Sequence, residues 1–414
     1  MNESLAFPCG RTVSNRLVKA AMYEAMANFG GGPPTDQLSN LYSEWAAGGW
    51  GMVITGNVQV SSQHLTLGRD VTLPKDDAEL GRFRLIANIL KSSFDGSKSI
   101  SVMQLSHAGR QSPRFIGGRR PWVPPLAASS NPMAPSESLL ARIVFWLLFQ
   151  SPRPMTSGDI SSVVSDFLHG AKTAYEAGFD GIQLHASHGF FIEPTIPSSF
   201  VVGVKLNAGD YAKDRLDENQ ALLHVRSIAE WGCVDFLEIS GGDYESPDFL
   251  AKDSPRQAFF STFSRKAREC VSQVDRRPLI MLTGSIRSVD TISKCLDQKH
   301  ADLIGIGRPS ILYPDLPQRL MREKIFPPVP DTPALPIWIA NIIQVKLVGA
   351  GLDTAMWVRA MKRLTRKDKR QLEGNAVDAF FHLFFNVTSI LPYLIVFSLT
   401  VATTVALLGY YTLH

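Results

Sequence analysis

The chain has 414 residues, 45% of them hydrophobic, which fits one domain of about 250 to 350 residues plus an appendage. The net charge of +4 is small, and the basic residues are not interleaved with aromatic ones, so nucleic acid is not an expected partner. The four cysteines are scattered and form no Cys-x-x-Cys pair. This spacing argues against an iron–sulfur cluster, a zinc ribbon or a disulfide framework.

Short apolar, β-branched runs alternate with helix-like stretches along most of the chain. This alternation is typical of a parallel α/β sheet, and eight such strands close most simply into a (β/α)8 TIM barrel. The strands are expected at Leu17–Ala21, Met52–Thr55, Ile100–Gln104, Gly181–Leu184, Val202–Leu206, Phe236–Ile239, Leu279–Leu282 and Leu303–Gly305. The helices are expected at Thr35–Ala47, Ala78–Ser92, Ser157–Ala177, Glu218–Trp231, Arg265–Val274 and Val289–Gln298.

A long excursion, residues 111–157, follows the third strand. It is rich in Pro, Ser and Gly and contains an apolar patch at Val144–Phe149. In a barrel, a long loop after a strand is usually a lid or a wall of the active site. The apolar patch also fits a loop that rests on a membrane, and the sequence does not decide between the two.

The connection between the fourth and fifth strands is short. Seventeen residues separate Leu184 from Val202, and Pro194 and Pro197 argue against a helix there. A parallel crossover normally takes a dozen or more residues and is usually helical. We therefore expect a barrel that lacks the helix between strands four and five, unless another segment fills the gap.

Two histidines, His185 and His188, stand where the fourth strand ends. The carboxyl ends of barrel strands are where the chemistry of such proteins is found. Two imidazoles at this place can both donate hydrogen bonds to one oxygen of a substrate. The alternatives are metal ligands or packed core rings. A metal normally needs a third protein ligand, and no Cys or carboxylate cluster stands nearby, so no metal is expected.

The C-terminal part of the chain has a different composition. Ile390–Tyr411 contains 22 residues without a charge, and as a helix this stretch would span about 33 Å, enough to cross a hydrocarbon core. A basic cluster at 359–370 precedes it, and the positive-inside tendency would keep the preceding domain in the cytosol. The domains expected are a barrel at 1–330, an amphipathic, basic linker at 331–384, and a single-pass anchor in an internal membrane, such as the endoplasmic reticulum, at 385–414. A buried core helix is the alternative for the last segment.

Nine short motifs occur in order on the predicted strands and loops. They are Asn15–Met22, Gly48–Gly56, Gln104–Arg110, Ala134–Ser136, Pro154–Thr156, Ala177–Gly181, Gly203–Asn207, Glu238–Gly242 and Gly305–Pro309. Together they resemble the Old Yellow Enzyme family of FMN-dependent ene-reductases, also called NADH:flavin oxidoreductases, over residues 5 to 320. The resemblance implies FMN as a bound cofactor and NAD(P)H as cosubstrate.

The resemblance also implies roles for individual residues. Gln104 offers an amide donor and a carbonyl acceptor to the pyrimidine edge of the flavin. Lys205 supplies a positive charge near flavin N1 and O2; the alternative for this residue is an ion pair at the barrel floor. The other implied cofactor contacts are Ala20, Ala21, Met22, Tyr23 and Gly56 around the ring, and Gly284, Ser285, Gly307 and Arg308 around the phosphate.

The implied reaction transfers a hydride from NAD(P)H through flavin N5 to a hydrophobic α,β-unsaturated carbonyl compound, whose oxygen is held by His185 and His188. The chain departs from its relatives at Phe190, where most of them carry a proton-donating tyrosine. Solvent or Tyr23 would have to donate the proton instead. A flavin-assisted isomerase or oxidase acting on an enone therefore remains an alternative, as does a catalytically inactive, membrane-bound remnant. The sequence does not predict the oligomeric state.

Overall fold

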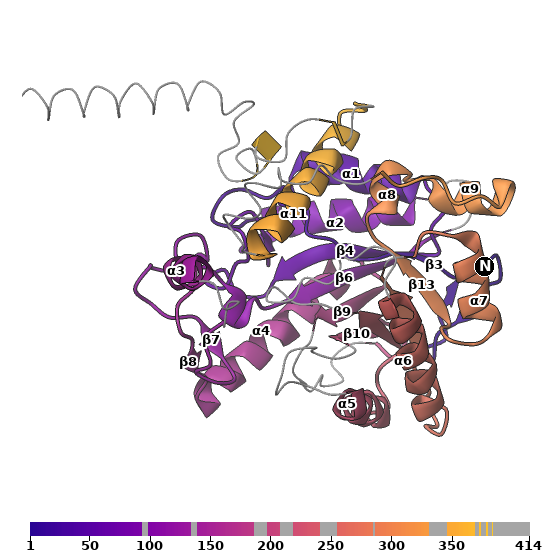
Figure 1. The fold of residues 1–414 in the computed structure, drawn as a ribbon, viewed down its shortest axis with the longest axis horizontal. Helices are drawn as coiled ribbons and strands as arrows, with labels where there is room; N and C mark the ends of the chain where they lie inside the picture. The colour runs from indigo at the N-terminus through magenta and orange to yellow at the C-terminus, as the bar shows by residue number, and fades with distance from the viewer. Residues whose placement is uncertain are drawn as a thin grey trace, which may run out of the picture.

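The computed structural model describes residues 1–92, 98–133, 139–185, 197–207, 218–240, 255–284, 286–330, 346–368, 372–373, 378–379 and 383. Its centre is a closed barrel of eight parallel strands (Figure 1). Around the ring they are β3 (Leu17–Lys19), β4 (Met52–Gln59), β6 (Ile100–Ser106), β9 (Gly181–His185), β10 (Val201–Asn207), β11 (Phe236–Ser240), β12 (Leu279–Thr283) and β13 (Leu303–Ile306). The predicted (β/α)8 barrel and its eight strands are confirmed.

Helices surround the barrel on the outside (Figure 1). The six at the predicted positions are α1 (Asp36–Ala46), α2 (Asp77–Lys91), α4 (Ser157–Glu176), α5 (Glu218–Glu230), α6 (Pro255–Val271) and α7 (Val289–Asp297). The structure adds α3 (Leu139–Leu148), α8 (Pro309–Leu312), α9 (Leu316–Glu323), α11 (Lys346–Leu364) and a short 3-10 turn at Gly109–Gln111. The short strand β5 (Val71–Thr72) pairs with the end of β4.

Local sequence signals fix the ends of α4. The side chain of Thr156 accepts a hydrogen bond from the backbone N–H of Asp159, and the Asp159 carboxylate accepts one from the backbone N–H of Thr156. This capping box satisfies two N–H groups that the helix itself leaves unpaired. Gly178 follows the helix with a φ of +87°, a left-handed conformation that glycine adopts without strain.

The barrel interior is divided along its length. Side chains of alternate residues point inward, and near the amino ends of the strands they are apolar, as at Met52, Val102, Phe236 and Met281. The antiparallel pair β1 (Leu5–Ala6) and β2 (Thr12–Val13) closes this end, and Val13 belongs to the same cluster. Toward the carboxyl ends, the inward-facing residues become polar or very small. The barrel therefore has an apolar interior at the amino ends of its strands and a polar one at their carboxyl ends.

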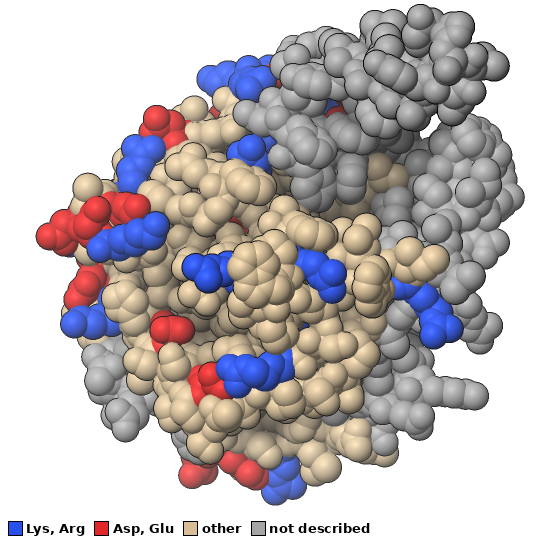
Figure 2. Space-filling model, turned by 90° about the vertical axis from the view of Figure 1, so that its left-hand side faces the viewer, with Lys and Arg blue, Asp and Glu red and all other residues tan. Residues whose placement is uncertain are grey.

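The excursion after β6 lies on one side of the molecule, toward which Figure 2 looks. Within it, β7 (Leu126–Ala127) and β8 (Arg153–Pro154) pair as parallel strands. Arg119 is buried inside it and bonds to the carbonyl of Val123 (3.0 Å) and to Ser112 (2.7 Å). The predicted apolar patch Val144–Phe149 coincides with the end of α3.

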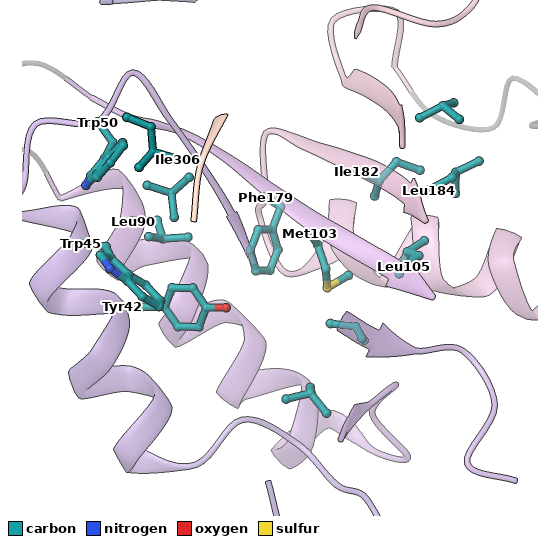
Figure 3. Packing of buried hydrophobic residues seen from close by; sticks show 14 of the residues in the cluster. Tyr42, Trp45, Trp50, Leu90, Met103, Leu105, Phe179, Ile182, Leu184 and Ile306 are labelled. Carbon is teal, nitrogen blue, oxygen red and sulfur yellow. The ribbon is translucent and has the colours of Figure 1, made fainter. Parts of the chain in front are cut away.

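A second apolar layer fills the space between the barrel and its helices (Figure 3). Tyr42 and Trp45 of α1 approach the strands there, where the fully buried Lys19 of β3 lies between them and the barrel. The Lys19 ammonium donates to the carbonyl of Ile54 (3.0 Å), lies 3.9 Å from the centre of the Trp45 ring and is 3.9 Å from the buried carboxylate of Glu24. Burial lowers the pKa of Lys19 to about 8, and the Glu24 carboxylate opposes this shift.

The helix α11 lies within the predicted linker, residues 331–384. Its apolar side chains, among them Met356, Trp357 and Met361, are buried in the same cluster as the barrel helices. Arg359, a member of the predicted basic cluster, is 7% exposed and binds the backbone carbonyl of Glu373 (2.7 Å). The segment 346–364 therefore packs as part of the barrel unit.

Two expectations fall outside the described residues. They are the missing helix between strands four and five, whose segment 186–196 is not described, and the membrane anchor at 385–414. Within the described residues, no helix combines the length and the apolar character needed to cross a bilayer.

Replacing Glu24 by glutamine should destabilise the fold, because a buried ammonium then loses the carboxylate that compensates its charge. We expect the free energy of unfolding to fall by about 3 kcal/mol, measured by urea denaturation. The matched control is Glu230→Gln on α5, which removes an exposed ion pair with Arg226 (2.9 Å) and should cost at most about 0.5 kcal/mol. Equal effects of the two substitutions would contradict this assignment.

Two histidines from the loops after β4 and β6 stack on each other. The rings of His64 and His107 lie 4.3 Å apart, and the Nε2 atom of His64 accepts a hydrogen bond from the backbone N–H of Leu126 (3.1 Å). Burial lowers the pKa of His64 to about 3, helped by His107 and by the positive charge of Arg119. Burial also lowers the pKa of His107 to about 4. Both rings are therefore neutral in the folded protein.

This stack should make stability fall on acidification. The unfolded chain takes up protons at these imidazoles below their ordinary pKa of about 6.5, whereas the folded chain does so only near pH 4. Between pH 7.5 and 5 we expect a loss on the order of 2 to 4 kcal/mol in unfolding free energy. The double variant His64→Asn/His107→Asn should flatten the profile, and the exposed His224→Asn should not. An unchanged profile in the double variant would refute the explanation.

Candidate active site at the barrel mouth

Four polar side chains cross the carboxyl end of the barrel, joined in one chain by two hydrogen bonds and one ion pair. Gln104 Nε2 donates to Gln183 Oε1 (2.7 Å), and Gln183 Nε2 donates to Glu238 Oε2 (2.7 Å). The other carboxylate oxygen of Glu238 lies 3.0 Å from Lys205 Nζ. The side chain of Lys205 is 16% exposed, whereas Glu238 has no exposed surface. The result is a rigidly held cation that faces the mouth.

A glycine lies in the strand between two members of this chain. Gly203 of β10 is paired in register with Gln183 of β9 and Phe236 of β11. A Cβ atom at Gly203 would lie 2.1 Å from the Phe236 ring. The missing side chain therefore leaves room for the Phe236 ring inside the barrel.

His185 stands above this chain at the end of β9 and is exposed to solvent. Its Nδ1 atom lies 3.2 Å from Oδ1 of Asn57 on β4. The register of β4 against β6 shifts between Ile54 and Asn57, so this irregularity turns Asn57 into the mouth beside Gln104. Although part of the His185 surface is exposed, burial of the rest of the side chain lowers its pKa to about 4; the Lys205 ammonium adds to this shift and the Glu238 carboxylate opposes it. His185 is thus neutral at physiological pH.

The opposite side of the mouth carries very small residues. Ala20 directly after β3, Gly56 of β4 and Gly305 of β13 provide little or no side chain here. A Cβ atom at Gly305 would lie 2.1 Å from Oγ1 of Thr283, and one at Gly56 would lie 2.5 Å from the carbonyl oxygen of Met22. Thr283 Oγ1 is itself buried without a hydrogen-bond partner among the described residues.

The segment after β3 runs along the rim. Ala21 is half-buried against the barrel interior, and Met22 and Tyr23 are half-buried against the outer core. The structure therefore brings the predicted ring contacts Ala20 to Tyr23 and Gly56 to the same end of the barrel as Gln104 and Lys205.

The loops after β12 and β13 hold the remaining predicted residues. Gly284 ends β12 with a φ of +138°, and Gly307 precedes Arg308 after β13. The Arg308 guanidinium is 2.8 Å from the Asp353 carboxylate of α11 and faces the Trp357 ring of the same helix at 5.7 Å. Burial lowers the pKa of Arg308, and Asp353 opposes this shift. The C-terminal helix thus supplies the carboxylate partner of this arginine.

Three predicted residues, His188, Phe190 and Ser285, lie outside the described residues. Among the described ones, no group of three or more His, Cys, Asp or Glu side chains is placed to hold a metal. Three residues of the site were not predicted: Asn57, Gln183 and Glu238. Side chains alternate between the two faces of a strand, so Gln183 lies on the same face as His185. The same alternation along the predicted strand Phe236–Ile239 indicates Glu238. Nothing in the sequence indicates the register shift that places Asn57.

Comparisons with known proteins identify a family. The sequence model of the NADH:flavin oxidoreductase / NADH oxidase family matches residues 9–200. The chain is 34% identical to the NADH-dependent flavin oxidoreductase iliE of Neonectria sp., a match covering 76% of this chain and 46% of that protein. It is 31% identical to the NADH-dependent flavin oxidoreductase iliE of Hypocrea jecorina, covering 76% of this chain and 86% of that protein. The match thus spans about half of the first relative and most of the second.

Two solved structures share the fold. A complex of 2-naphthoyl-CoA reductase with 2-naphthoyl-CoA superimposes with a TM-score of 0.61 at 16% identity, over 78% of this chain and 52% of that one. The Old Yellow Enzyme homologue of Zymomonas mobilis gives 0.60 at 19% identity, over 79% and 93%. With its relatives and its barrel, the chain belongs to the NADH:flavin oxidoreductase / NADH oxidase family and is a flavin-dependent oxidoreductase, with FMN as cofactor and NAD(P)H as reductant.

Proposed function

We propose that this protein is an ene-reductase that reduces the activated C=C bond of a hydrophobic α,β-unsaturated carbonyl compound. The observation that carries the proposal is the arrangement at the mouth: a buried chain from Gln104 to Lys205 lies beneath an accessible, neutral His185. A flavin ring would need the amide groups and the cation of this chain at its edge. A substrate stacked on the ring would need a hydrogen-bond donor such as His185 for its oxygen.

The residues present fit a flavin ring. One side of the mouth offers amide groups and a fixed cation, which complement the donors, acceptors and developing negative charge of the pyrimidine edge. On the other side, Ala20, Gly56 and Gly305 carry little or no side chain, and a flat ligand could therefore approach the backbone closely there. The buried Thr283 hydroxyl adds a polar atom without a partner among the described residues.

For the phosphate end of FMN we propose Arg308 with the backbone of Gly284 and Gly307, and Ser285 from the sequence alone. A guanidinium is suited to a phosphate because its N–H groups match two oxygens at once. Asp353 and Trp357 restrict the Arg308 side chain from one side. In this proposal Asp353 orients the guanidinium and α11 becomes part of the wall of the site.

When FMN is bound, the chemistry it supplies is hydride transfer from NAD(P)H to the activated double bond. Lys205 stabilises negative charge at the pyrimidine edge during that chemistry. His185, with His188 as a second donor proposed from the sequence, binds the substrate carbonyl. Because His185 is neutral, only one of its nitrogens carries a proton. Donation from Nε2 therefore requires that Nδ1 accept, with the amide NH2 group of Asn57 turned toward it.

A second candidate, a flavin-assisted isomerase, is favoured by one observation. Phe190 stands where relatives carry a proton-donating tyrosine, and a phenyl ring cannot protonate the α-carbon. If solvent or Tyr23 delivers that proton slowly, the Cα–Cβ single bond of the enolate can rotate before the hydride returns from the β-carbon. Net isomerisation of a bound enone would result, without consumption of NAD(P)H.

We further propose that the substrate is lipid-soluble and that residues 385–414 anchor the protein in an internal membrane, with the barrel in the cytosol. The support is the sequence alone, namely the uncharged stretch Ile390–Tyr411. An anchored enzyme would meet a hydrophobic enone at the bilayer where that compound partitions.

The decisive measurement is the absorbance of the purified full chain in detergent under anaerobic conditions. We expect a yellow protein whose flavin band is bleached by NADH or NADPH and restored in one turnover by a hydrophobic acyclic enone. A protein without flavin would support the inactive remnant. Conversion of the enone to an isomer without loss of reductant would support the isomerase.

Lys205→Met gives this measurement a control specific to the site. Loss of the cation should slow bleaching by about 10- to 100-fold. The double variant Lys205→Met/Glu238→Gln removes the carboxylate that would otherwise remain buried and unpaired. If the double variant is stable yet still slow, the effect is one of charge and not of folding.

Phe190→Tyr should raise the rate of enone reduction and lower isomerisation, because it restores a proton donor at the position where relatives have one. Both rates are read from one chromatographic time course of products. The matched control is Phe191→Tyr, one residue further on, where the added hydroxyl has no expected role. No change in either rate for Phe190→Tyr would contradict our explanation of the departure.

A further inference from the structure

The excursion after β6 carries an exposed aromatic and basic surface that the proposed reaction does not use. On α3 the side chains of Ile143, Trp146 and Leu147 are 52%, 69% and 48% exposed, at the spacing of one helix face. Phe115 and Trp122, from the preceding loop, are 56% and 72% exposed. Together with Arg114, Arg120 and Arg142, these residues make up what we call the tryptophan–arginine face.

These rings are held at the surface, because neighbouring residues in the same segments are packed or hydrogen-bonded to the rest of the excursion. Phe145 of α3 is 6% exposed and packs on Phe149 with ring centres 5.6 Å apart, which anchors the helix by its inner side. The backbone N–H of Arg114 donates to the carbonyl of Leu148 (2.7 Å), joining the Phe115 loop to α3. Buried Arg119 ties the Trp122 turn to the same loop through Ser112 and Val123.

The charge of this region is one-sided. Residues 107–156 contain six arginines, at 110, 114, 119, 120, 142 and 153, and one acidic residue, Glu137, although the whole chain has 42 basic and 38 acidic residues. Arg114 faces the Trp146 ring at 5.5 Å, and Arg120 faces the Trp122 ring at 6.0 Å. Figure 2 shows Lys and Arg side chains over mostly uncharged surface in the middle of this face, with acidic ones toward its left-hand and lower parts.

Exposed Trp, Leu and Ile beside arginine are the composition of a surface that lies in the interface of an anionic bilayer. Tryptophan suits the headgroup level because it is apolar with one N–H donor, while arginine binds lipid phosphates. A second copy of the chain would bring the same arginines against this face and repel it. The uncharged stretch Ile390–Tyr411 offers no carboxylate to complement them.

We propose that the tryptophan–arginine face binds the surface of a bilayer rich in anionic lipids, with α3 lying in the membrane plane. At 10 residues α3 is too short to span the bilayer. The face belongs to the loop that leaves the carboxyl end of β6, the end at which Gln104 and His185 lie. Contact would therefore turn the mouth of the barrel toward the membrane. This inference does not depend on the identity of the reaction.

The test uses the tryptophan fluorescence of the full chain on vesicles of dibrominated phosphatidylcholine and phosphatidylserine, because bromine quenches only rings that reach the acyl region. We expect strong quenching in the parent protein and loss of at least half of it in Trp122→Phe/Trp146→Phe. Trp231→Phe on the outer side of the barrel is the control and should keep the quenching. Vesicles without phosphatidylserine should reduce the quenching several-fold.

Three results would overturn the proposal. If the double variant were quenched as strongly as the parent protein, the signal would come from other tryptophans. Vesicle binding without quenching of the parent protein would show attachment through another segment, such as the C-terminal stretch. A concentration-dependent dimer whose Trp122 and Trp146 are shielded from acrylamide in solution would show that a second copy covers the face.

Discussion

A single carboxylate with no exposed surface, that of Glu238, organises the mouth of this barrel. It accepts a hydrogen bond from Gln183 on one side and pairs with the Lys205 ammonium on the other. A buried charge is tolerated only where its partners are complete, so this side chain fixes two neighbours at once. Gln104 is fixed in turn through Gln183. The polar layer therefore behaves as one unit, carried by four neighbouring strands.

A second buried pair, Lys19 and Glu24, lies behind the small residues of the mouth. Glu24 also accepts hydrogen bonds from Tyr42 of α1 and from the backbone N–H of Gly56. The pair thus joins the loop after β3, the end of β4 and an outer helix. The Glu238–Lys205 pair joins β10 and β11, whereas the Lys19–Glu24 pair joins β3 to the loop that follows it. Such support is what a catalytic constellation needs to keep its geometry.

The sequence predicts the barrel well because each strand is buried on both faces and therefore forms a continuous apolar run, as in Leu279–Leu282. His185 is predicted because it ends such a run, whereas Gln104 and Lys205 are predicted from the resemblance to the family. What could not be predicted depends on neighbours distant in the chain. The hydrogen bond between Gln183 and Glu238 joins residues that are far apart in the sequence, and Asn57 enters the site only through a shift in register. The burial of Arg359 in α11 could not be read from a cluster of basic residues.

The ion pair between Arg308 and Asp353 links two parts of the chain that a truncation at the end of the barrel would separate. Cutting after residue 330 would leave a complete ring of eight strands, yet it would strip the guanidinium of its acidic neighbour and uncover the surface on which Met356 and Trp357 rest. Loss of flavin from such a shortened protein would then reflect the missing helix and not the chemistry of the barrel. Any minimal catalytic fragment should therefore retain α11.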